Sequence, residues 1–232
     1  MPRLTLGPIG SGALLAFTAG FVDTTGFIAL FGLFTAHVTG NFVLIGAGLV
    51  EPHQALIGKL LALPVFVLVV ATTRLFVLAR EARGRNAVPG LVIGQALFLV
   101  LFLLAGIAAG PIGHGDEPAA ILAGMMGVMA MAIQNAGSRT VFATLSPTTV
   151  MTGNVTQVVI DLVDLAARKT SGDQARGRLT KMLPAVIAFA AGAIAGAFGY
   201  KLFSFWCLLA PIVTVSAVLV HLLPRAQSAG PA

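Results

Sequence analysis

Two short stretches of this sequence, "TAHVTGN" at residues 35–41 and "TTVMTGN" at residues 148–154, carry the same Thr-Gly-Asn triplet about half a chain apart. Both triplets lie in apolar surroundings, and glycine and asparagine are poor residues for the interior of a helix. A helix-interrupting triplet that recurs at this distance indicates that the two halves of the chain are copies of each other. The fold therefore depends on what these two interruptions do.

The composition is that of a membrane protein. Of the 232 residues, 57% are hydrophobic and 9% are charged, whereas about 25% of residues are charged in a soluble domain. Lysine and arginine collect in the cytoplasmic loops of membrane proteins, so the net charge of +6 does not indicate a nucleic-acid partner. We predict an integral membrane protein that is embedded in the lipid bilayer and binds no nucleic acid.

Apolar runs of about 20 residues, the length that a helix needs to cross the hydrocarbon core, predict the spanning helices. Six such runs cover residues 11–32, 57–79, 88–110, 118–138, 182–200 and 203–222. Two shorter apolar pieces, 42–50 and 155–167, each follow a triplet and are predicted to be re-entrant half-helices. The expected fold class is all-α, a polytopic membrane bundle of about six spanning helices with two re-entrant segments.

The two halves also resemble each other outside the triplets. The stretch "GKLLALPVFVLVVATTRL" resembles "TKMLPAVIAFAAGAIAGAFGYKL". We predict one membrane domain made of a first repeat, residues 1–112, and a second repeat, residues 113–225, followed by a short tail at residues 226–232. With three spans in each half the repeats are inverted relative to each other, an architecture that puts binding sites near the bilayer midplane.

The positive charges favour six spans over eight. If all the apolar pieces crossed the membrane, lysine and arginine would divide almost evenly between its two sides. If the short pieces are re-entrant, every lysine and arginine except Lys59 and Lys201 lies on one side, which is then the cytoplasmic side. We expect both termini and the basic run at 168–181 in the cytoplasm, the loop at 51–56 outside and the loop at 170–176 inside.

The triplets are suited to a binding site made from broken helices. Gly40 and Gly153 permit backbone angles that other residues resist. The polar members, which can cap the following helix by accepting hydrogen bonds from its first amides, are Thr39, Asn41, Thr152 and Asn154. In an inverted repeat the two breaks would meet near the centre and aim two positive helix ends at one small volume. The alternative is architectural: glycine and asparagine end a kinked helix whose polar groups are satisfied by neighbours.

Asp23 lies near the middle of the first predicted span, where an ionisable side chain costs about 2.5 to 3.5 kcal/mol and suggests a functional site. Its counterpart in the second half is the neutral pair Gln134 and Asn135. Asp23 is either a proton- or cation-coupling group or a structural group that accepts hydrogen bonds from the triplet amides or pairs with Arg139. His37 either titrates near neutral pH or acts as a hydrogen-bonding spacer.

The predicted function is the passage of a small anionic or polar neutral solute through a midplane site. This site is formed by both triplets with Asp23, His37, Gln134 and Asn135 beside them. The alternative is a non-transporting scaffold that binds lipid or a partner protein. We expect neither an enzyme nor a bound cofactor or metal, because the sequence has no metalloprotease motif, nucleophile elbow or phosphate-binding glycine loop.

Gly192 and Gly196 have the small-xxx-small spacing that lets membrane helices approach closely. This face serves either a homodimer or the bundle within one chain.

The stretches "LLAFTAGFVDTTGFIALFGLFTAHVTGN" and "MAIQNAGSRTVFATLSPTTVMTGNVTQ" closely resemble the YoaK-type family of small bacterial integral membrane proteins, a domain of unknown function. The resemblance covers nearly the whole chain and implies a location in the bacterial inner membrane. It implies little about the substrate, since the activity of the family is not established. The chain departs from the commoner family pattern around Ser138 to Pro147, so no role is carried onto those positions.

Overall fold

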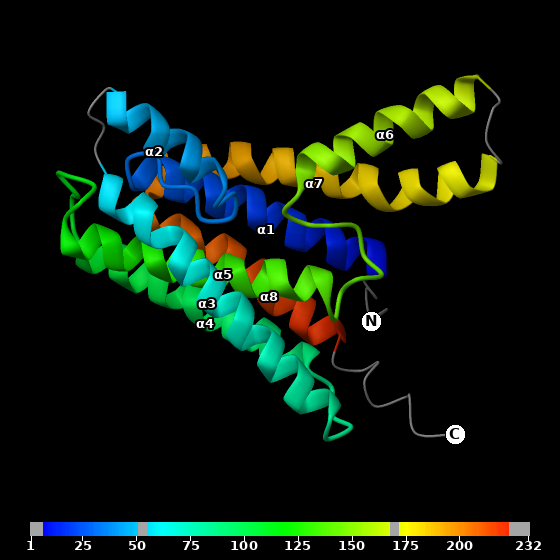
Figure 1. Cartoon of the computed structure of the whole chain (residues 1–232), viewed down its shortest axis with the longest axis horizontal. Coiled ribbons are helices and arrows are strands. Elements are labelled where there is room, and N and C mark those ends of the chain that lie inside the picture. Colours follow the sequence, from blue (N-terminus) through cyan, green and yellow to red (C-terminus); the bar gives the residue numbers. More distant parts are fainter. Residues whose placement is uncertain (1–6, 51–54, 168–171, 223–232) are drawn as a thin grey trace.

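The computed structural model describes residues 7–50, 55–167 and 172–222, and every regular element within them is helical (Figure 1). The elements are α1 (Pro8–Ala29), α2 (Gly40–Val50), α3 (Leu56–Glu81), α4 (Val88–Ala108), α5 (Pro118–Arg139), α6 (Met151–Ala166), α7 (Gly172–Phe203), the 3-10 helix η1 (Ser204–Leu208) and α8 (Leu209–Leu222). The predicted all-α class is confirmed for these residues. The predicted tail at 226–232, and most of the 51–56 loop, lie outside the described residues.

Several helical stretches are long and apolar enough to cross a membrane. They are Ile9–Ala29, Leu56–Glu81, Val88–Ala108, Pro118–Arg139 and Gly172–His221, the last of which contains α7, η1 and α8. Large apolar side chains point outward from the bundle, for example Leu49 and Val50 of α2, which are 78% and 84% exposed. Such exposure is stable when lipid surrounds the helices, since lipid tails are as apolar as leucine.

The helix α7 begins about ten residues earlier than the predicted span, which started at residue 182. Most of the basic run at 168–181, predicted to be a loop, therefore belongs to α7; residues 168–171 lie outside the described part of the chain. Alanine, glutamine, arginine, leucine and lysine favour helix regardless of polarity. The hydropathy of this run thus marks where the helix leaves the membrane and not where the helix begins.

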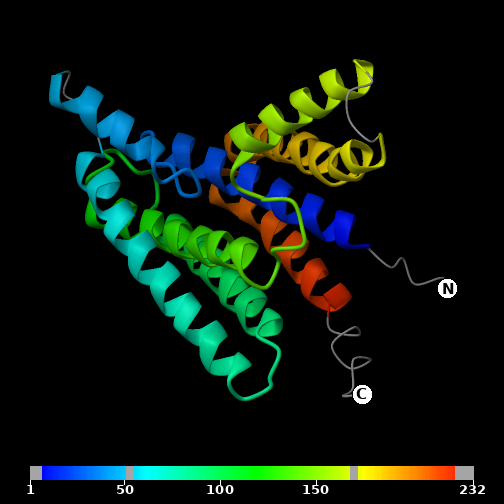
Figure 2. The ribbon, with the colours of Figure 1, turned by 45° about the vertical axis from the view of Figure 1, so that its right-hand side comes forward.

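The long helices run alternately between two ends of the bundle (Figures 1 and 2). We call the end where α1 begins and α8 ends the terminal face, and the other end the opposite face. Helices α1, α4 and α7 run from the terminal face to the opposite face, and α3, α5 and α8 return. The two short helices run in contrary directions, since α2 runs toward the opposite face and α6 toward the terminal face.

A non-helical segment precedes each short helix. We call residues 30–39 the first loop and residues 140–150 the second loop. Helix α1 ends at Ala29, just before Phe31 and Gly32, which have left-handed backbone angles with φ of 52° and 87°. The predicted breaks at the triplets are therefore shifted: α2 begins at Gly40, so the triplet lies at the start of the short helix and the loop before it is the interruption.

Helices α1 and α7 form the most extensive helix pair of the bundle. A Cβ atom on Gly192 would lie 2.1 Å from the carbonyl oxygen of Phe17, and one on Gly196 would lie 2.5 Å from that of Phe21. Both glycines are buried in this contact. The small-xxx-small face thus serves the bundle within one chain, and homodimer formation stays a prediction.

Candidate functional site

The carboxylate of Asp23 holds the first loop against α1. Asp23 lies six residues before Ala29, the last residue of α1, which corresponds to about 9 Å along the helix axis. Its Oδ1 accepts hydrogen bonds from the backbone N–H groups of Thr35 at 2.8 Å and Ala36 at 2.7 Å. Asp23 is 5% exposed. It therefore accepts backbone amides as the structural alternative predicted, although these amides precede the triplet.

His37 is the ionisable partner of Asp23. Its ring Nδ1 lies 2.6 Å from Asp23 Oδ2, and its side chain is 37% exposed whereas that of Asp23 is 6% exposed. The ring also makes edge contacts with the rings of Phe34 and Phe189 at centroid distances of 6.3 and 5.6 Å. The alternative pairing of Asp23 with Arg139 is wrong within the described residues, where the ion pair of Asp23 is with His37. The pair links an interior carboxylate to a ring that is partly accessible.

Asn41 closes the first loop through two hydrogen bonds. Its Oδ1 accepts from the backbone N–H of Phe34, and its Nδ2 donates to the carbonyl oxygen of Phe34, each at 2.9 Å. A Cβ atom on Gly40 would lie 2.9 Å from the Phe34 ring, so only glycine lets that ring lie so close to α2. Asn41 is 1% exposed. The predicted capping role is replaced by a clamp, because its side chain bonds backward to the loop.

Asn154 clamps the second loop in the same way but with a single backbone hydrogen bond. Its Nδ2 donates to the carbonyl oxygen of Pro147 at 2.7 Å, again seven residues earlier. Proline has no N–H group, so the second bond of the Asn41 clamp has no counterpart here. The N-cap of α6 is Val150, which makes no side-chain cap hydrogen bond. Capping by the second triplet is therefore also replaced by a clamp.

Gln134 and Asn135 take the place of Asp23 beside the second loop, as predicted from their position. Asn135 Oδ1 accepts a hydrogen bond from the hydroxyl of Thr149 at 2.6 Å. Gln134 Nε2 donates to Thr148 Oγ1 at 3.0 Å, and its Oε1 accepts from Gln95 Nε2 at 2.6 Å. The second loop is thus held by neutral side chains, whereas the first is held by a carboxylate.

The predicted site residues form two groups that lie in different layers of the bundle. Asp23, His37 and Asn41 form the group around the first loop, and Gln134, Asn135 and Asn154 form the group around the second loop. The second group lies beside Leu15 of α1, whose carbonyl oxygen accepts a hydrogen bond from Gln134. Leu15 precedes Asp23 by eight residues, which corresponds to about 12 Å along the helix. Of the remaining predicted residues, Thr39 ends the first loop, and the others lie at the starts of α2 and α6; Thr39, Thr152 and Gly153 are exposed.

Phe189 of α7 lies between the two loops. Its ring contacts His37 of the first loop. It also packs against the buried cluster of Ala16, Met151 and Ala185, in which Met151 begins α6 directly after the second loop. An aromatic side chain thus connects the two groups of site residues. Its role was not predictable, because an apolar residue in an apolar span carries no signal of its own.

An ion pair with a buried carboxylate joins α6 to α7, and it was not predicted from the sequence. The guanidinium of Arg178 pairs with the carboxylate of Asp161, whose side chain is 0% exposed. Gln157 also donates a hydrogen bond to Asp161 at 3.0 Å. Asp161 in an apolar segment could have indicated this ion pair, because a buried charge needs a partner. Gln95, a lone polar residue in the apolar span of α4, gave the same kind of signal.

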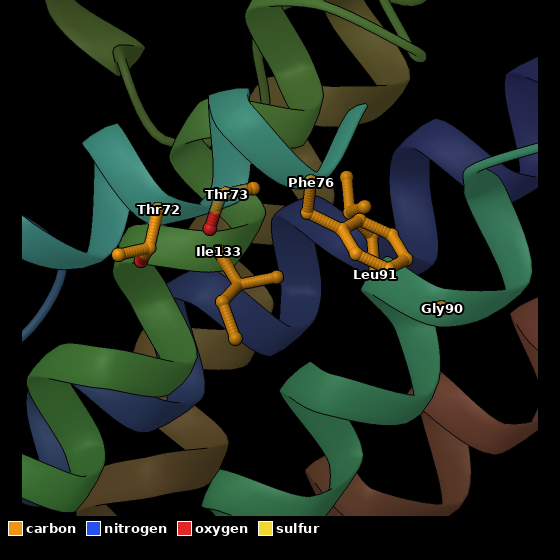
Figure 3. Close-up of a pocket in the computed structure, with 6 residues that line it drawn as sticks. All are labelled: Thr72, Thr73, Phe76, Gly90, Leu91 and Ile133. Carbon is orange, nitrogen blue, oxygen red and sulfur yellow. The ribbon is translucent and has the colours of Figure 1, made fainter. Parts of the chain in front are cut away.

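Two cavities lie between helices, away from the loop clamps. Figure 3 presents the first, of about 200 Å³, between α3, α4 and α5; it is lined by Thr72, Thr73, Phe76, Gly90, Leu91 and Ile133. The second, of about 420 Å³, is lined by Phe21, Gly199, Phe203, Trp206, Cys207, Leu209 and Ala210. Both linings are largely apolar, and neither includes a predicted site residue. These cavities fit acyl chains or other apolar groups better than a polar solute.

Membrane-spanning stretches, outward apolar side chains and polar clamps that bury non-helical backbone define a polytopic integral membrane protein. The sequence matches the family described as "Protein of unknown function (DUF1275)" over residues 11–221, and the chain belongs to that family. It is 28% identical over 210 residues to the UPF0700 transmembrane protein YoaK of Bacillus subtilis (strain 168), covering 90% of this chain and 91% of that relative. The predicted family is therefore confirmed. No solved structure matches the chain.

We expect alanine substitution of the two clamp residues, Asn41 and Asn154, to reduce thermal stability by unequal amounts. Asn41→Ala removes two hydrogen bonds to the Phe34 backbone, whereas Asn154→Ala removes one to the Pro147 backbone. A buried backbone group left unpaired costs about 1 to 3 kcal/mol, so we expect Asn41→Ala to lower the thermal unfolding midpoint roughly twice as far. Midpoints measured on the detergent-purified protein test this, with Thr152→Ala at an exposed neighbouring position as the control. Equal losses at both asparagines would contradict the two-bond clamp.

Proposed function

We propose that the protein passes a small anionic or polar neutral solute across the inner membrane. The observation that supports this best is the contact of 2.6 Å between Asp23 and His37. Ionisable groups inside a spanning bundle are costly and mark solute or proton pathways in membrane proteins. His37 reaches the accessible surface while Asp23 stays inside, so the pair connects the interior of the bundle to a solute or proton outside it.

The proposal rests on an inverted repeat of residues 1–112 and 113–225 with re-entrant loops. Three features support this arrangement. Helices α1, α2, α3 and α4 run opposite to α5, α6, α7 and α8, respectively, in Figures 1 and 2. Each loop is clamped by an asparagine seven residues after the carbonyl group that it binds. Both loops turn back along a spanning helix, and such backbone is tolerated at membrane depth when protein buries it.

The terminal face is the proposed cytoplasmic face. Arg80 and Arg139 lie near the ends of α3 and α5 that reach this face, whereas Lys59 and Lys201 belong to the helix ends at the opposite face. This distribution fits the positive-inside rule and puts both termini in the cytoplasm.

Single cysteines test this orientation. In a Cys207→Ser background, Ala82→Cys between α3 and α4 should react with a membrane-impermeant maleimide only after spheroplasts are lysed. Ala119→Cys at the start of α5 should react in intact spheroplasts, because α5 begins at the opposite face. Both alanines are exposed, so reactivity reports the side of the membrane and not burial. Labelling of both from the same side would exclude the inverted repeat.

The two loops differ in charge, and this difference indicates which loop an anionic solute would bind beside. In the first loop the carboxylate of Asp23 already accepts the amides that lead into α2. The second loop has the neutral Asn135 in the corresponding place. Helix N-termini attract negative charge. An anionic solute is therefore better accommodated near the start of α6 than near the start of α2.

A non-transporting scaffold is the second candidate, and a specific observation favours it. Asn41 and Asn154 are 1% and 2% exposed, and both are hydrogen bonded to backbone. Side chains so occupied do not bind a solute in this conformation. In the scaffold the loops are purely architectural, whereas in the transporter they release these bonds as the protein changes conformation.

Flux into proteoliposomes separates the two candidates. We expect the wild type to pass at least one solute from a panel of small anions, organic acids and neutral polar molecules. The Asn41→Leu and Asn154→Leu double variant should abolish this flux, and Asp23→Asn should remove its dependence on pH, because it removes the carboxylate that pairs with His37. Ser216→Ala, at an exposed position of α8 away from both loops, serves as the control. If no solute moves through monodisperse, folded protein, the scaffold is the correct function.

A further inference from the structure

A small cavity lies between the first turns of α1 and the second loop. Its volume is about 30 Å³, and its lining residues are Ile9, Gly12, Thr144, Leu145, Ser146 and Lys181. A water molecule needs a cavity of about 10 to 15 Å³, so the space admits two or three oxygen-sized atoms. Ile9 and Lys181 are exposed. The cavity therefore opens at the surface of the bundle, close to the terminal face where α1 begins.

A buried hydroxyl group without a partner lines this cavity. Ser146 is 7% exposed, and its Oγ makes no hydrogen bond within the described residues. The same is true of Ser11, which is 1% exposed and precedes the cavity-lining Gly12. A buried polar group left unsatisfied costs about 1 to 3 kcal/mol. Native proteins rarely keep such groups unless water, an ion or a ligand satisfies them.

The corresponding place beside the first loop is filled by the chain itself. Lys59 of α3 is 4% exposed, and its Nζ donates a hydrogen bond to the carbonyl oxygen of Phe31 at 2.9 Å. The alignment of "GKLL" with "TKML" pairs Lys59 with Lys181, and the alignment of the triplets pairs Phe31 with Thr144. Lys181 stays exposed, and the cavity lies between it and the loop. The second half thus leaves a space where the first half has an internal contact.

We propose that this cavity binds a phosphate oxyanion, either the phosphate of an anionic lipid headgroup or free inorganic phosphate. Lys181 supplies the positive charge, and Ser146 supplies a hydroxyl donor. The positive end of the dipole of α1, a helix of 22 residues, lies beside Ile9. The lining contains no acidic residue to oppose an anion. Only the phosphate oxygens fit the cavity, so the rest of the molecule lies outside, as in basic headgroup sites on the cytoplasmic side of membrane proteins.

The site does not depend on the proposed transport function, and it is tested by binding. The full chain is purified in detergent, and its thermal midpoint is measured with and without inorganic phosphate. The protein is also placed in nanodiscs of phosphatidylcholine with or without phosphatidylglycerol, and retained lipid is counted by native mass spectrometry. We expect Lys181→Met to weaken binding about tenfold, the effect of losing one charged hydrogen bond. Lys201→Met, an exposed lysine at the other end of α7, is the matched control.

Ser146→Ala keeps the test independent of folding. This change removes an unpaired hydroxyl, so the ligand-free protein should be as stable as the wild type or slightly more stable, while phosphate or phosphatidylglycerol binding falls several-fold. Stabilisation by inorganic phosphate identifies a free anion as the ligand, and retention of phosphatidylglycerol without a phosphate effect identifies a lipid headgroup. The proposal is overturned if neither probe binds, or if Lys201→Met weakens binding as much as Lys181→Met, since water then fills the cavity.

Discussion

The Gly192→Ala variant is expected to lose much of its thermal stability, whereas Gly177→Ala on the same helix is expected to be slightly more stable than the wild type. A Cβ atom on Gly192 would lie 2.1 Å from the carbonyl oxygen of Phe17, but one on Gly177 would have no atom within 4 Å. Both substitutions gain up to about 1 kcal/mol from better helix propensity. At Gly192 this gain is outweighed by overpacking, which costs about 1 to 3 kcal/mol.

The overpacking cost at Gly192 is expected at the upper end of this range, because the atom that the new Cβ would meet belongs to the backbone of α1. A flexible side chain can rotate away, but the carbonyl group of Phe17 can move only if α1 separates from α7. Unfolding followed by the fluorescence of the single tryptophan, Trp206, tests the pair of variants. Gly196→Ala, which would place its Cβ 2.5 Å from the carbonyl oxygen of Phe21, should behave like Gly192→Ala. If Gly192→Ala and Gly177→Ala shift the midpoint alike, α1 and α7 are not in close contact in the membrane.

The spanning helices were predictable from the sequence because the thickness of the bilayer fixes the length of an apolar run. Helix α4, for example, was predicted over 88–110 and covers Val88–Ala108. The start of α7 was not predictable in this way, since α7 continues past the apolar run through residues that are polar but helix-forming. Hydropathy reports contact with lipid, and helix boundaries outside the lipid depend on propensity and packing instead.

The candidate site was only partly predictable. The repeated triplets directed attention to Asn41 and Asn154, and the structure gives both the same kind of clamp. Their partners are backbone groups, the N–H and carbonyl groups of Phe34 and the carbonyl group of Pro147, so no side-chain signal marks them. The pair of Asp161 and Arg178 joins α6 to α7. Contacts of this kind follow from how the helices pack and not from local sequence.

Asp23→Leu is expected to be the most damaging single change at the candidate site. It leaves the backbone N–H groups of Thr35 and Ala36 and the ring of His37 without their acceptor. At about 1 to 3 kcal/mol for each unsatisfied buried donor, the free energy of unfolding should fall by roughly 3 kcal/mol or more. Asp23→Asn should cost less, because its carboxamide oxygen can still accept both amides, while its NH2 group replaces the charged oxygen that faces Nδ1 of His37.

Comparison of these two variants separates the structural role of Asp23 from a coupling role. Thermal midpoints of the purified protein are measured for both, with Asp164→Asn on α6 as the control carboxylate. If Asp23→Asn folds nearly as stably as the wild type yet loses the pH dependence of solute flux, the carboxylate holds the loop through its oxygen and couples through its charge. If Asp23→Asn is as unstable as Asp23→Leu, the ion pair with His37 is what holds the first loop, and Asp23 is not free to act as a coupling group.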